Sequence, residues 1–182
     1  MIERIALSQG GRVTSVDASS NTIGTEFGNY TADVANVIPP QKAGRIAGIA
    51  GAADNTGWCP IDPVSFASKL VPNVHVIGDA IIAGGIPKSA SAAAAQGKAC
   101  AAAIVNLLAG KPPEQPRLTG ACYNTVAPGY AFSLSGIYQP KGEQFAEVEV
   151  KTSPVGASRE IRAQEAENAL SWFRTLTGDV FG

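Results

Sequence analysis

The residue with the most distinctive surroundings is Cys59, which stands between a tryptophan and a proline in the segment NTGWCPID (55–62). A thiol held by such rigid neighbours is either a redox group or an inert side chain buried in a turn, and free cysteines are usually buried. The chain has two further cysteines, Cys100 and Cys122, and one histidine, His75, at spacings that fit no set of metal ligands. This composition argues against a zinc site and a Ser-His-Asp triad. The odd number of cysteines leaves at least one thiol without a partner in the chain.

A second candidate site lies at the end of the segment VHVIGDA (74–80), which predicts a strand followed by a loop and a helix. An aspartate at the carboxyl end of a buried strand, here Asp79, can accept hydrogen bonds from sugar or ribityl hydroxyls. The N-terminus of the following helix can stabilise electron density on a ligand, because its first N–H groups are free. The alternative is that Asp79 only initiates the turn into the helix, as aspartate commonly does.

That helix is predicted over KSASAAAAQGKACAAAIVNLLAG (88–110), with Pro87 in its first turn and Gly110 as its C-terminal cap. Its first half carries only Ser, Ala, Gly, Gln and Lys side chains. Small side chains allow a close approach, so either a neighbouring sheet or a flat cofactor can lie against this half of the helix.

The sequence before this region predicts a β-meander with strands at 12–16, 21–27 and 31–38, the last stopped by Pro39-Pro40. Turns are expected at 17–21 and 28–29. Little precedes the meander that could cover its faces, so it looks like the edge of something larger. A glycine- and alanine-rich stretch with weak helical spacing follows the prolines.

The composition changes after a proline-rich linker at 111–117. The segment 122–140 is aromatic and β-like, with turns expected at 128–129 and near Gly136, and 143–150 alternates as a strand. The closing segment 159–178 predicts an amphipathic helix. Its apolar face is expected to carry Ile161, Ala166, Ala169, Leu170, Phe173 and Leu176.

Composition and charge exclude several classes of partner. With 45% hydrophobic and 16% charged residues the chain is typical of a globular protein, and its net charge of −1 does not favour nucleic acid or an anionic membrane surface. No apolar run approaches the roughly 18 residues needed to span a bilayer. The N-terminal segment carries Glu3 and Arg4 and lacks the apolar core of a signal peptide.

Two features of the chain point to a larger parent protein. No GxGxxG motif follows a strand, so the part of a dinucleotide fold that binds ADP is missing from these residues. The chain also opens on a meander without a partner sheet. Both features are explained if the chain is the C-terminal part of a longer flavoprotein.

Several motifs together resemble the flavin subunit of flavocytochrome c sulfide dehydrogenase, a relative of glutathione reductase. The resemblance extends from about Val13 onward, and the segments that carry it are NVIPPQKAG (36–44), TGWCPIDP (56–63), VHVIGDA (74–80), IPKSASAAAAQGKACAAAI (86–104), APGYAFSLSGIYQP (127–140) and SWFRTLTGDVFG (171–182). The GDA motif is shared by all relatives of glutathione reductase, whereas the GWCP loop and the region after Gly110 are not shared by all of them. The resemblance implies an α/β chain of mixed α+β character. It would contain the tail of an NAD-like domain (1–38), the returning segment of an FAD domain (39–110) and a smaller α+β C-terminal domain (111–182).

The resemblance also implies roles for particular residues. Cys59 matches the second cysteine of a redox-active disulfide beside the flavin, whose first cysteine would lie outside this chain. Asp79, between Gly78 and Ala80, matches the residue that contacts the FAD ribityl region. Further cofactor contacts are expected from Pro87, Lys88, Ser89 and Trp58, and Trp172 matches an aromatic position on the electron path to the haem. Trp172 can equally be a core residue of the last helix.

The activity implied by the resemblance is an FAD-dependent oxidation of sulfide. Sulfide would attack the disulfide, the remaining thiolate would pass electrons to the flavin, and a c-type cytochrome subunit would receive them one at a time. The family resemblance implies a periplasmic location and no membrane span. Lys42 and Lys88 are cations on the expected flavin side and would favour its anionic reduced form.

Two other functions are compatible with the same residues. A sulfide:quinone oxidoreductase or a related NADH dehydrogenase would need an amphipathic membrane anchor at the C-terminus, but the last helix carries a well-charged face, which disfavours a quinone partner. A non-catalytic module that docks a cytochrome would bind no flavin. Cys100 and His75 are expected to be structural, and Cys122 is expected to be free or to pair with Cys59 in a misfolded chain.

Overall fold

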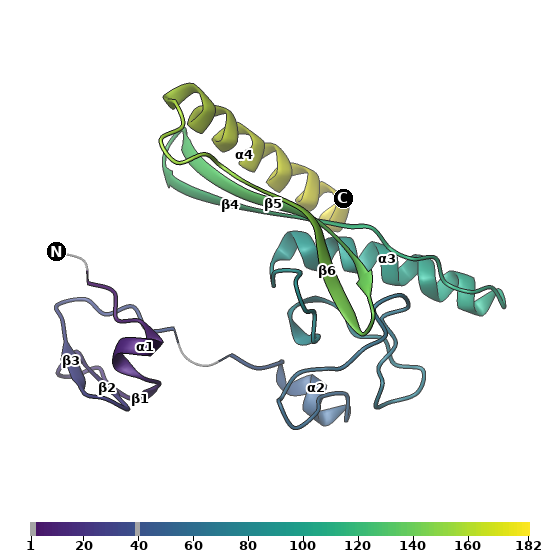
Figure 1. The fold of residues 1–182 in the computed structure, drawn as a ribbon, viewed down its shortest axis with the longest axis horizontal. Helices are drawn as coiled ribbons and strands as arrows, with labels where there is room; N and C mark the ends of the chain where they lie inside the picture. The colour runs from purple at the N-terminus through teal and green to yellow at the C-terminus, as the bar shows by residue number, and fades with distance from the viewer. Residues whose placement is uncertain (1–2, 39–40) are drawn as a thin grey trace. The chain divides into compact units, whose positions relative to one another are not determined.

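The structure, a computed structural model, describes residues 3–38 and 41–182. Its contacts divide the chain into two compact units, Met1–Lys42 and Ala43–Gly182. Figure 1 shows the elements of each unit. We call them unit 1 and unit 2, and each is described by itself.

Unit 1 contains a short helix and a three-stranded antiparallel sheet. Helix α1 (Leu7–Gly10) is followed by strands β1 (Val13–Asp17), β2 (Thr22–Thr25) and β3 (Asn29–Thr31), in the order β1-β2-β3. The β1–β2 turn is built by Asp17, whose carboxylate accepts hydrogen bonds from the amide of Ser19 and from two serine hydroxyls. The first two strands and their turn are confirmed.

The third strand predicted for unit 1 is wrong. A strand was expected at 31–38, but β3 covers only 29–31 and includes Asn29, which was assigned to a turn. In the described part of unit 1, residues 32–38 pair with no further strand, and Val34 is 87% exposed. An apolar run without a neighbouring strand has no ladder to join. The expected stop at Pro39-Pro40 lies outside the described residues.

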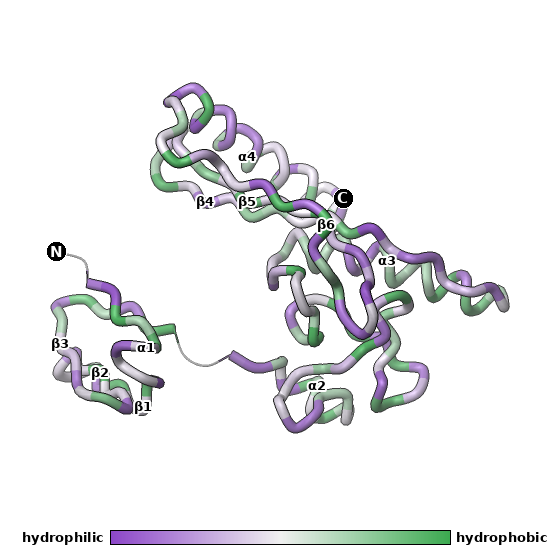
Figure 2. Tube along the Cα trace, in the orientation of Figure 1, coloured by the Kyte–Doolittle hydropathy of each residue, from purple (hydrophilic) through white to green (hydrophobic). Residues whose placement is uncertain are grey.

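Unit 2 ends in an antiparallel sheet with a long helix across one face. Strands β4 (Leu118–Ala127), β5 (Tyr130–Lys141) and β6 (Gln144–Thr152) follow one another in the order β4-β5-β6, and helix α4 (Arg159–Phe181) packs mainly on β5. The turn predicted at Pro128-Gly129 is confirmed, with Gly129 at φ 65°. The turn predicted near Gly136 is wrong, because Gly136 lies inside β5, opposite Gly120. The polar and apolar alternation that predicted β6 is visible in Figure 2.

Helix α4 is confirmed, but it is rotated relative to its predicted apolar face. The residues that face the sheet include Arg162, Glu165 and Ala166, while Leu170 and Phe173 are exposed, Phe173 by 58%. The Arg162–Glu165 ion pair can lie beneath the helix because both side chains also have hydrogen-bond partners outside the pair. These partners are the hydroxyls of Ser133 and Ser153 and the carbonyl of Pro154.

Helix α3 (Ala90–Leu108) begins two residues later than predicted. Ser89 is its N-cap, since the Ser89 hydroxyl accepts a hydrogen bond from the amide of Ala92 at 3.2 Å. Pro87 therefore lies in the loop before the helix and not in its first turn. At the other end Gly110 takes the left-handed conformation, φ 69°, that favours glycine after a helix.

The segment 74–80 is not a regular strand. It pairs with residues 66–68 through the bridge Ala67–His75, and its last three residues form the short 3-10 helix η1 (Gly78–Ala80). Its apolar pattern is typical of a strand, but this short pairing does not extend into a regular ladder. The weakly helical stretch before the cysteine loop contains helix α2 (Arg45–Ile49).

One core joins the loops, α3 and the sheet of unit 2. The amide of Gly85 donates to the carbonyl of Phe145 at 2.9 Å, so the loop before α3 docks on the start of β6. The core residues are Ile61, Phe66, Ile81, Ala83, Ile86, Ala92, Cys100, Leu118, Tyr138 and Phe145. The mixed α/β class, with an α+β C-terminal region, is confirmed. The domain boundaries stay predictions.

Candidate functional site

The Asp79 turn is held against the side of α3. Gly78 adopts φ 72°, and its amide donates to the side-chain oxygen of Gln96 in α3 at 2.6 Å. Gln96 is buried, so this hydrogen bond satisfies a polar group that would otherwise be costly inside the protein. The Asp79 side chain remains exposed beside the helix. The turn thus presents an unshielded carboxylate next to the start of α3.

Lys88 connects this turn to the cysteine loop. Its Nζ donates hydrogen bonds to the carbonyl oxygens of Asp79 and Ile81, the latter at 2.9 Å. The same Nζ lies 3.8 Å from the ring centroid of Trp58, within the range of a cation–π contact. Partial burial lowers the pKa of Lys88, an effect that the nearby Asp79 carboxylate opposes. The structure therefore brings Trp58, Asp79 and Lys88 together.

Cys59 lies beneath this arrangement and is completely buried, with 0% of its surface exposed. Its amide donates to the carbonyl of Ala80, and its own carbonyl accepts from the amide of Ile82, each at 2.9 Å. Burial raises the pKa of its thiol, and Asp54 raises it further, while Lys88 acts in the opposite direction. In this conformation Cys59 offers no exposed surface to a substrate or to a second cysteine.

Cys122 has different surroundings from the other two cysteines. It lies in β4, and it is the only one of the three cysteines that is not buried; all three are described. The neighbouring residue Tyr123 contacts Trp172 of α4, with ring centroids 6.0 Å apart. Because successive residues of a strand point to opposite faces, the Cys122 side chain faces away from α4. Phe132 and Val150 are exposed on the same side of the sheet.

The position of Cys122 is tied to the start of α3. The amide of the preceding residue, Ala121, donates to the hydroxyl of Ser91 in the first turn of α3 at 3.0 Å. This bond joins the residue next to Cys122 to a side chain in the first turn of α3. The signal that could have identified it is its place in the β-rich C-terminal region, where one strand face is expected to remain open.

Tyr138 lies along the same face of the sheet. A Cβ atom added to Gly136 would come 2.4 Å from the Tyr138 hydroxyl oxygen, so the ring crosses over this glycine. Burial raises the pKa of Tyr138 most, and Glu147 and Cys122 raise it further. Gly136 was assigned to a turn from the sequence, but its lack of a side chain leaves the space that the Tyr138 ring occupies.

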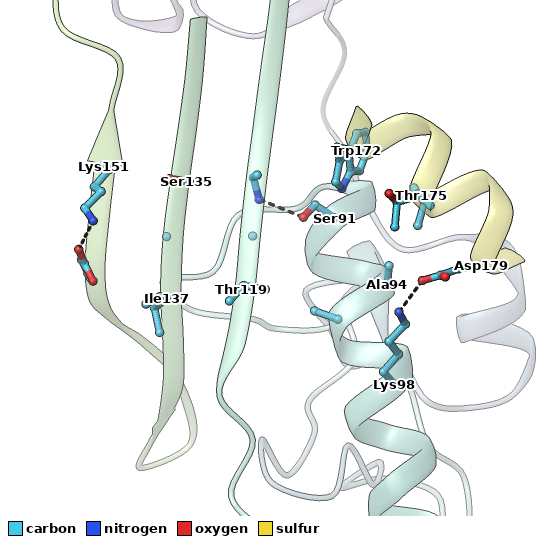
Figure 3. A pocket seen from close by; sticks show the side chains of 16 residues that line it. Ser91, Ala94, Lys98, Thr119, Ser135, Ile137, Lys151, Trp172, Thr175 and Asp179 are labelled. Atoms are coloured by element: carbon cyan, nitrogen blue, oxygen red, sulfur yellow. Dashed lines mark hydrogen bonds and ion pairs between the residues drawn. The ribbon is translucent and has the colours of Figure 1, made fainter. Parts of the chain in front are cut away.

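Trp172 lines a pocket of about 500 Å³ between α3, the sheet and α4 (Figure 3). Lys98 of α3 and Asp179 of α4 form an ion pair of 2.6 Å across it. The α3 residues in the pocket are Ser91, Ala94, Ala95 and Lys98, whereas those that meet the Gly78–Ala80 turn and the residue before it include Ala93, Gln96 and Gly97. The pocket and the turn therefore lie on different sides of α3. Trp172 therefore lies on another side of α3 from the site that contains Trp58, Asp79 and Lys88.

Other residues singled out from the sequence have structural surroundings. Cys100 is buried in α3, where burial raises its pKa. The Nδ1 of His75 lies 2.8 Å from the carbonyl oxygen of Ser65. Within residues 3–38 and 41–182, no cluster of three acidic, histidine or cysteine side chains could hold a metal ion. No helix in the same ranges is long and apolar enough to cross a membrane.

The C-terminal sheet and its covering helix form an α+β arrangement, which the turn at α3 precedes in the chain. Comparison with known families makes the assignment specific. Residues 114–181, which contain β4, β5, β6 and all of α4, match the family described as flavocytochrome c sulphide dehydrogenase, flavin-binding. For these residues the resemblance expected from the sequence is confirmed.

Proposed function

We propose that this chain is part of an FAD-dependent dehydrogenase that oxidises sulfide and passes the electrons to a c-type cytochrome. The observation that carries the proposal is the position of Cys122. It is the accessible cysteine of the region that matches the flavin-binding family, and one hydrogen bond ties its strand to the start of α3. The family's name supports a flavin and a cytochrome.

The residues around the Asp79 turn fit a flavin nucleotide. The exposed Asp79 carboxylate can accept hydrogen bonds from ribityl hydroxyls. Ser89 caps α3 through the amide of Ala92, and the amides of Ala90 and Ser91 lie in the same first turn, where no intrahelical acceptor exists. These N–H groups suit an electron-rich carbonyl. When bound, the flavin would supply two-electron oxidation coupled to one-electron transfer.

The sulfur chemistry in this proposal belongs to Cys122 and not to Cys59. Sulfide would attack a disulfide between Cys122 and a second cysteine, so that one S–S bond breaks, a persulfide forms on one cysteine and a thiolate is released on the other. Overall, HS⁻ yields elemental sulfur, one proton and two electrons, and two ferric haems of the cytochrome each accept one electron. The resemblance matches Cys59 to the second cysteine of such a disulfide, and Cys59 is completely buried in this structure.

Trp172 and the location of the protein complete the proposal. Trp172 contacts Tyr123, the residue next to Cys122, so an aromatic pair connects the Cys122 strand with the surface of α4. This contact supports a role for Trp172 on the path toward the cytochrome. A periplasmic location follows from the resemblance and is part of the same proposal.

The test uses the protein purified in full length from its native source, together with its natural partners. We expect flavin absorption bands and anaerobic, sulfide-dependent reduction of the bound cytochrome, lost in Cys122→Ser. The matched control is Cys100→Ser, which removes a buried packing thiol and should retain turnover. Absence of flavin bands would contradict the proposal and favour a non-catalytic docking module. Full activity in Cys122→Ser would remove Cys122 from the mechanism.

A further inference from the structure

The ammonium group of Lys88 is committed to three contacts inside unit 2. Two are hydrogen bonds to the backbone carbonyls of Asp79 and Ile81, which lie on either side of Ala80. The third is the indole ring of Trp58. An ammonium group has three protons to donate and no acceptor. Two carbonyls and a ring face therefore account for its bonding capacity.

These contacts span a short ladder between two separate loops. The cysteine loop and the turn after η1 are joined by the parallel bridge Cys59–Ile81, through two backbone hydrogen bonds, Cys59 N–H to Ala80 O and Ile82 N–H to Cys59 O. Such a two-bond ladder is too short to be stable alone. Lys88 stabilises this ladder because its ammonium group bonds to carbonyl oxygens of the turn and also contacts the Trp58 indole of the cysteine loop.

The arrangement differs from that of a lysine that serves a ligand. A lysine that contacts a bound anion would direct its ammonium group into open space next to the site. Lys98, which lies within α3, is an example of an exposed lysine. Its Nζ pairs with the Asp179 carboxylate. The Nζ of Lys88 instead faces carbonyl oxygens and an aromatic face of its own chain.

We infer that Lys88 is a positioning residue that fixes the Gly78–Ala80 turn to the Trp58 loop and thereby sets the place of the Asp79 carboxylate. It acts through the two carbonyls and the indole, and we call these three contacts the Lys88 clamp. The relevance of the clamp to flavin binding rests on the proposed function, but the existence of the clamp does not.

The clamp is tested in the full chain without flavin, by amide hydrogen exchange. Lys88→Met retains the aliphatic stem and removes the donor. We expect exchange at the amides of Cys59 and Ile82 to accelerate about tenfold or more, because a hydrogen bond from a charged donor typically contributes that factor or more. Exchange at the amide of Arg162 in α4 should not change. Lys98→Met is the matched control and should leave all three amides unchanged.

A second readout reports on the indole. In a Trp172→Phe background Trp58 is the only tryptophan, and we expect acrylamide to quench its fluorescence about twice as efficiently after Lys88→Met. Lys88→Arg should restore both readouts, since a guanidinium can donate to two carbonyls and stack on an indole. If Lys88→Met does not fold, Trp58→Leu provides the test from the other side, with faster exchange expected at Cys59 and Ile82.

Three results would overturn the inference. The first is a Lys88→Met protein whose exchange and quenching equal those of Lys98→Met. The second is uniform acceleration at every amide, which would indicate only a loss of global stability. The third is failure of Lys88→Arg to restore either readout. Because no flavin is present, these results are independent of the flavin bands that test the proposed function.

Discussion

The burial of the three thiols predicts a clear order of chemical reactivity. Under native conditions iodoacetamide should modify Cys122 first, while Cys59 and Cys100 should react only when the structure opens. A thiol must be exposed and deprotonated to react, and burial raises the pKa of both Cys59 and Cys100. The prediction therefore compares one half-exposed strand residue with two core residues of the same chain.

The size of the difference follows from the contacts that hold Cys59. Exposing it breaks two backbone hydrogen bonds, worth about 1 kcal/mol each, and removes a buried side chain from the core for about 1 kcal/mol more. A total of about 3 kcal/mol corresponds to roughly 150-fold slower modification, at about 1.4 kcal/mol for each factor of ten. The raised pKa of the Cys59 thiol slows the reaction further. We thus expect at least about 100-fold protection relative to Cys122.

The assay is timed alkylation followed by proteolysis and mass spectrometry, with peptide intensities giving a rate for each cysteine. A parallel reaction in denaturant provides the unprotected rate for each thiol. In denaturant the three rates should fall within a few-fold of one another. If Cys59 reacts as fast as Cys122 in the native protein, the argument that assigns the sulfur chemistry to Cys122 is refuted.

Three further predictions concern Glu165 and Gly136 in unit 2 and Asp17 in unit 1. Glu165→Gln breaks the ion pair under α4 and should lower the free energy of unfolding by roughly 3 kcal/mol, measured by chemical denaturation. The hydrogen bond from Ser153 lowers the pKa of Glu165 most, so the stability that this carboxylate contributes is complete above its ordinary pKa and should vanish as the pH falls through its lowered folded value. Gly136→Ala forces a Cβ against the Tyr138 ring and should cost roughly 1–3 kcal/mol in the same assay. The carboxyl group of Asp17 should titrate at about pH 2 when followed by NMR, because serine hydroxyls and an amide hydrogen-bond its charged form.

Glu165→Gln and Gly136→Ala each have a matched control, and the Asp17 titration has a variant that tests its cause. Glu167→Gln removes an exposed carboxylate from the same helix and should change stability little. Gly48→Ala places a Cβ in open space on α2, so it should not destabilise the protein. Ser19→Ala removes the hydroxyl whose hydrogen bond lowers the pKa of Asp17 most, and it should raise the titration midpoint of that carboxyl group. Equal effects in a variant and its control would contradict the corresponding structural reason.

Local rules predicted much of unit 2. The cap at Gly110, the turn at Pro128-Gly129 and the alternation of β6 depend on a few neighbouring residues, so their sequence signals are direct. The start of α4 at the Ser158 cap is another element of this kind. The GDA motif was predicted at the end of a strand before α3, but it forms a 3-10 turn beside α3 and the segment 74–80 is not a regular strand.

The errors share one physical origin. The segments 31–38 and 74–80 have strand-like patterns, but a strand needs a neighbour with which to pair, and pattern alone does not supply it. The buried face of α4 includes Arg162 because serines and a carbonyl from distant strands partner its ion pair. A hydrophobic pattern read along one helix contains no information about such partners.

The sequence by itself determined where α3, α4 and β6 of unit 2 fall, to within a few residues, and which motifs relate its C-terminal region to a flavin-binding family. Only the tertiary structure decided which cysteine is accessible. Cys59 has the more distinctive neighbours in the chain, yet the loop and turn around it close over its sulfur, whereas Cys122 lies on the side of the sheet that α4 leaves open. Burial depends on packing between residues far apart in the chain, and that is why a local motif identified the loop but not which thiol is exposed.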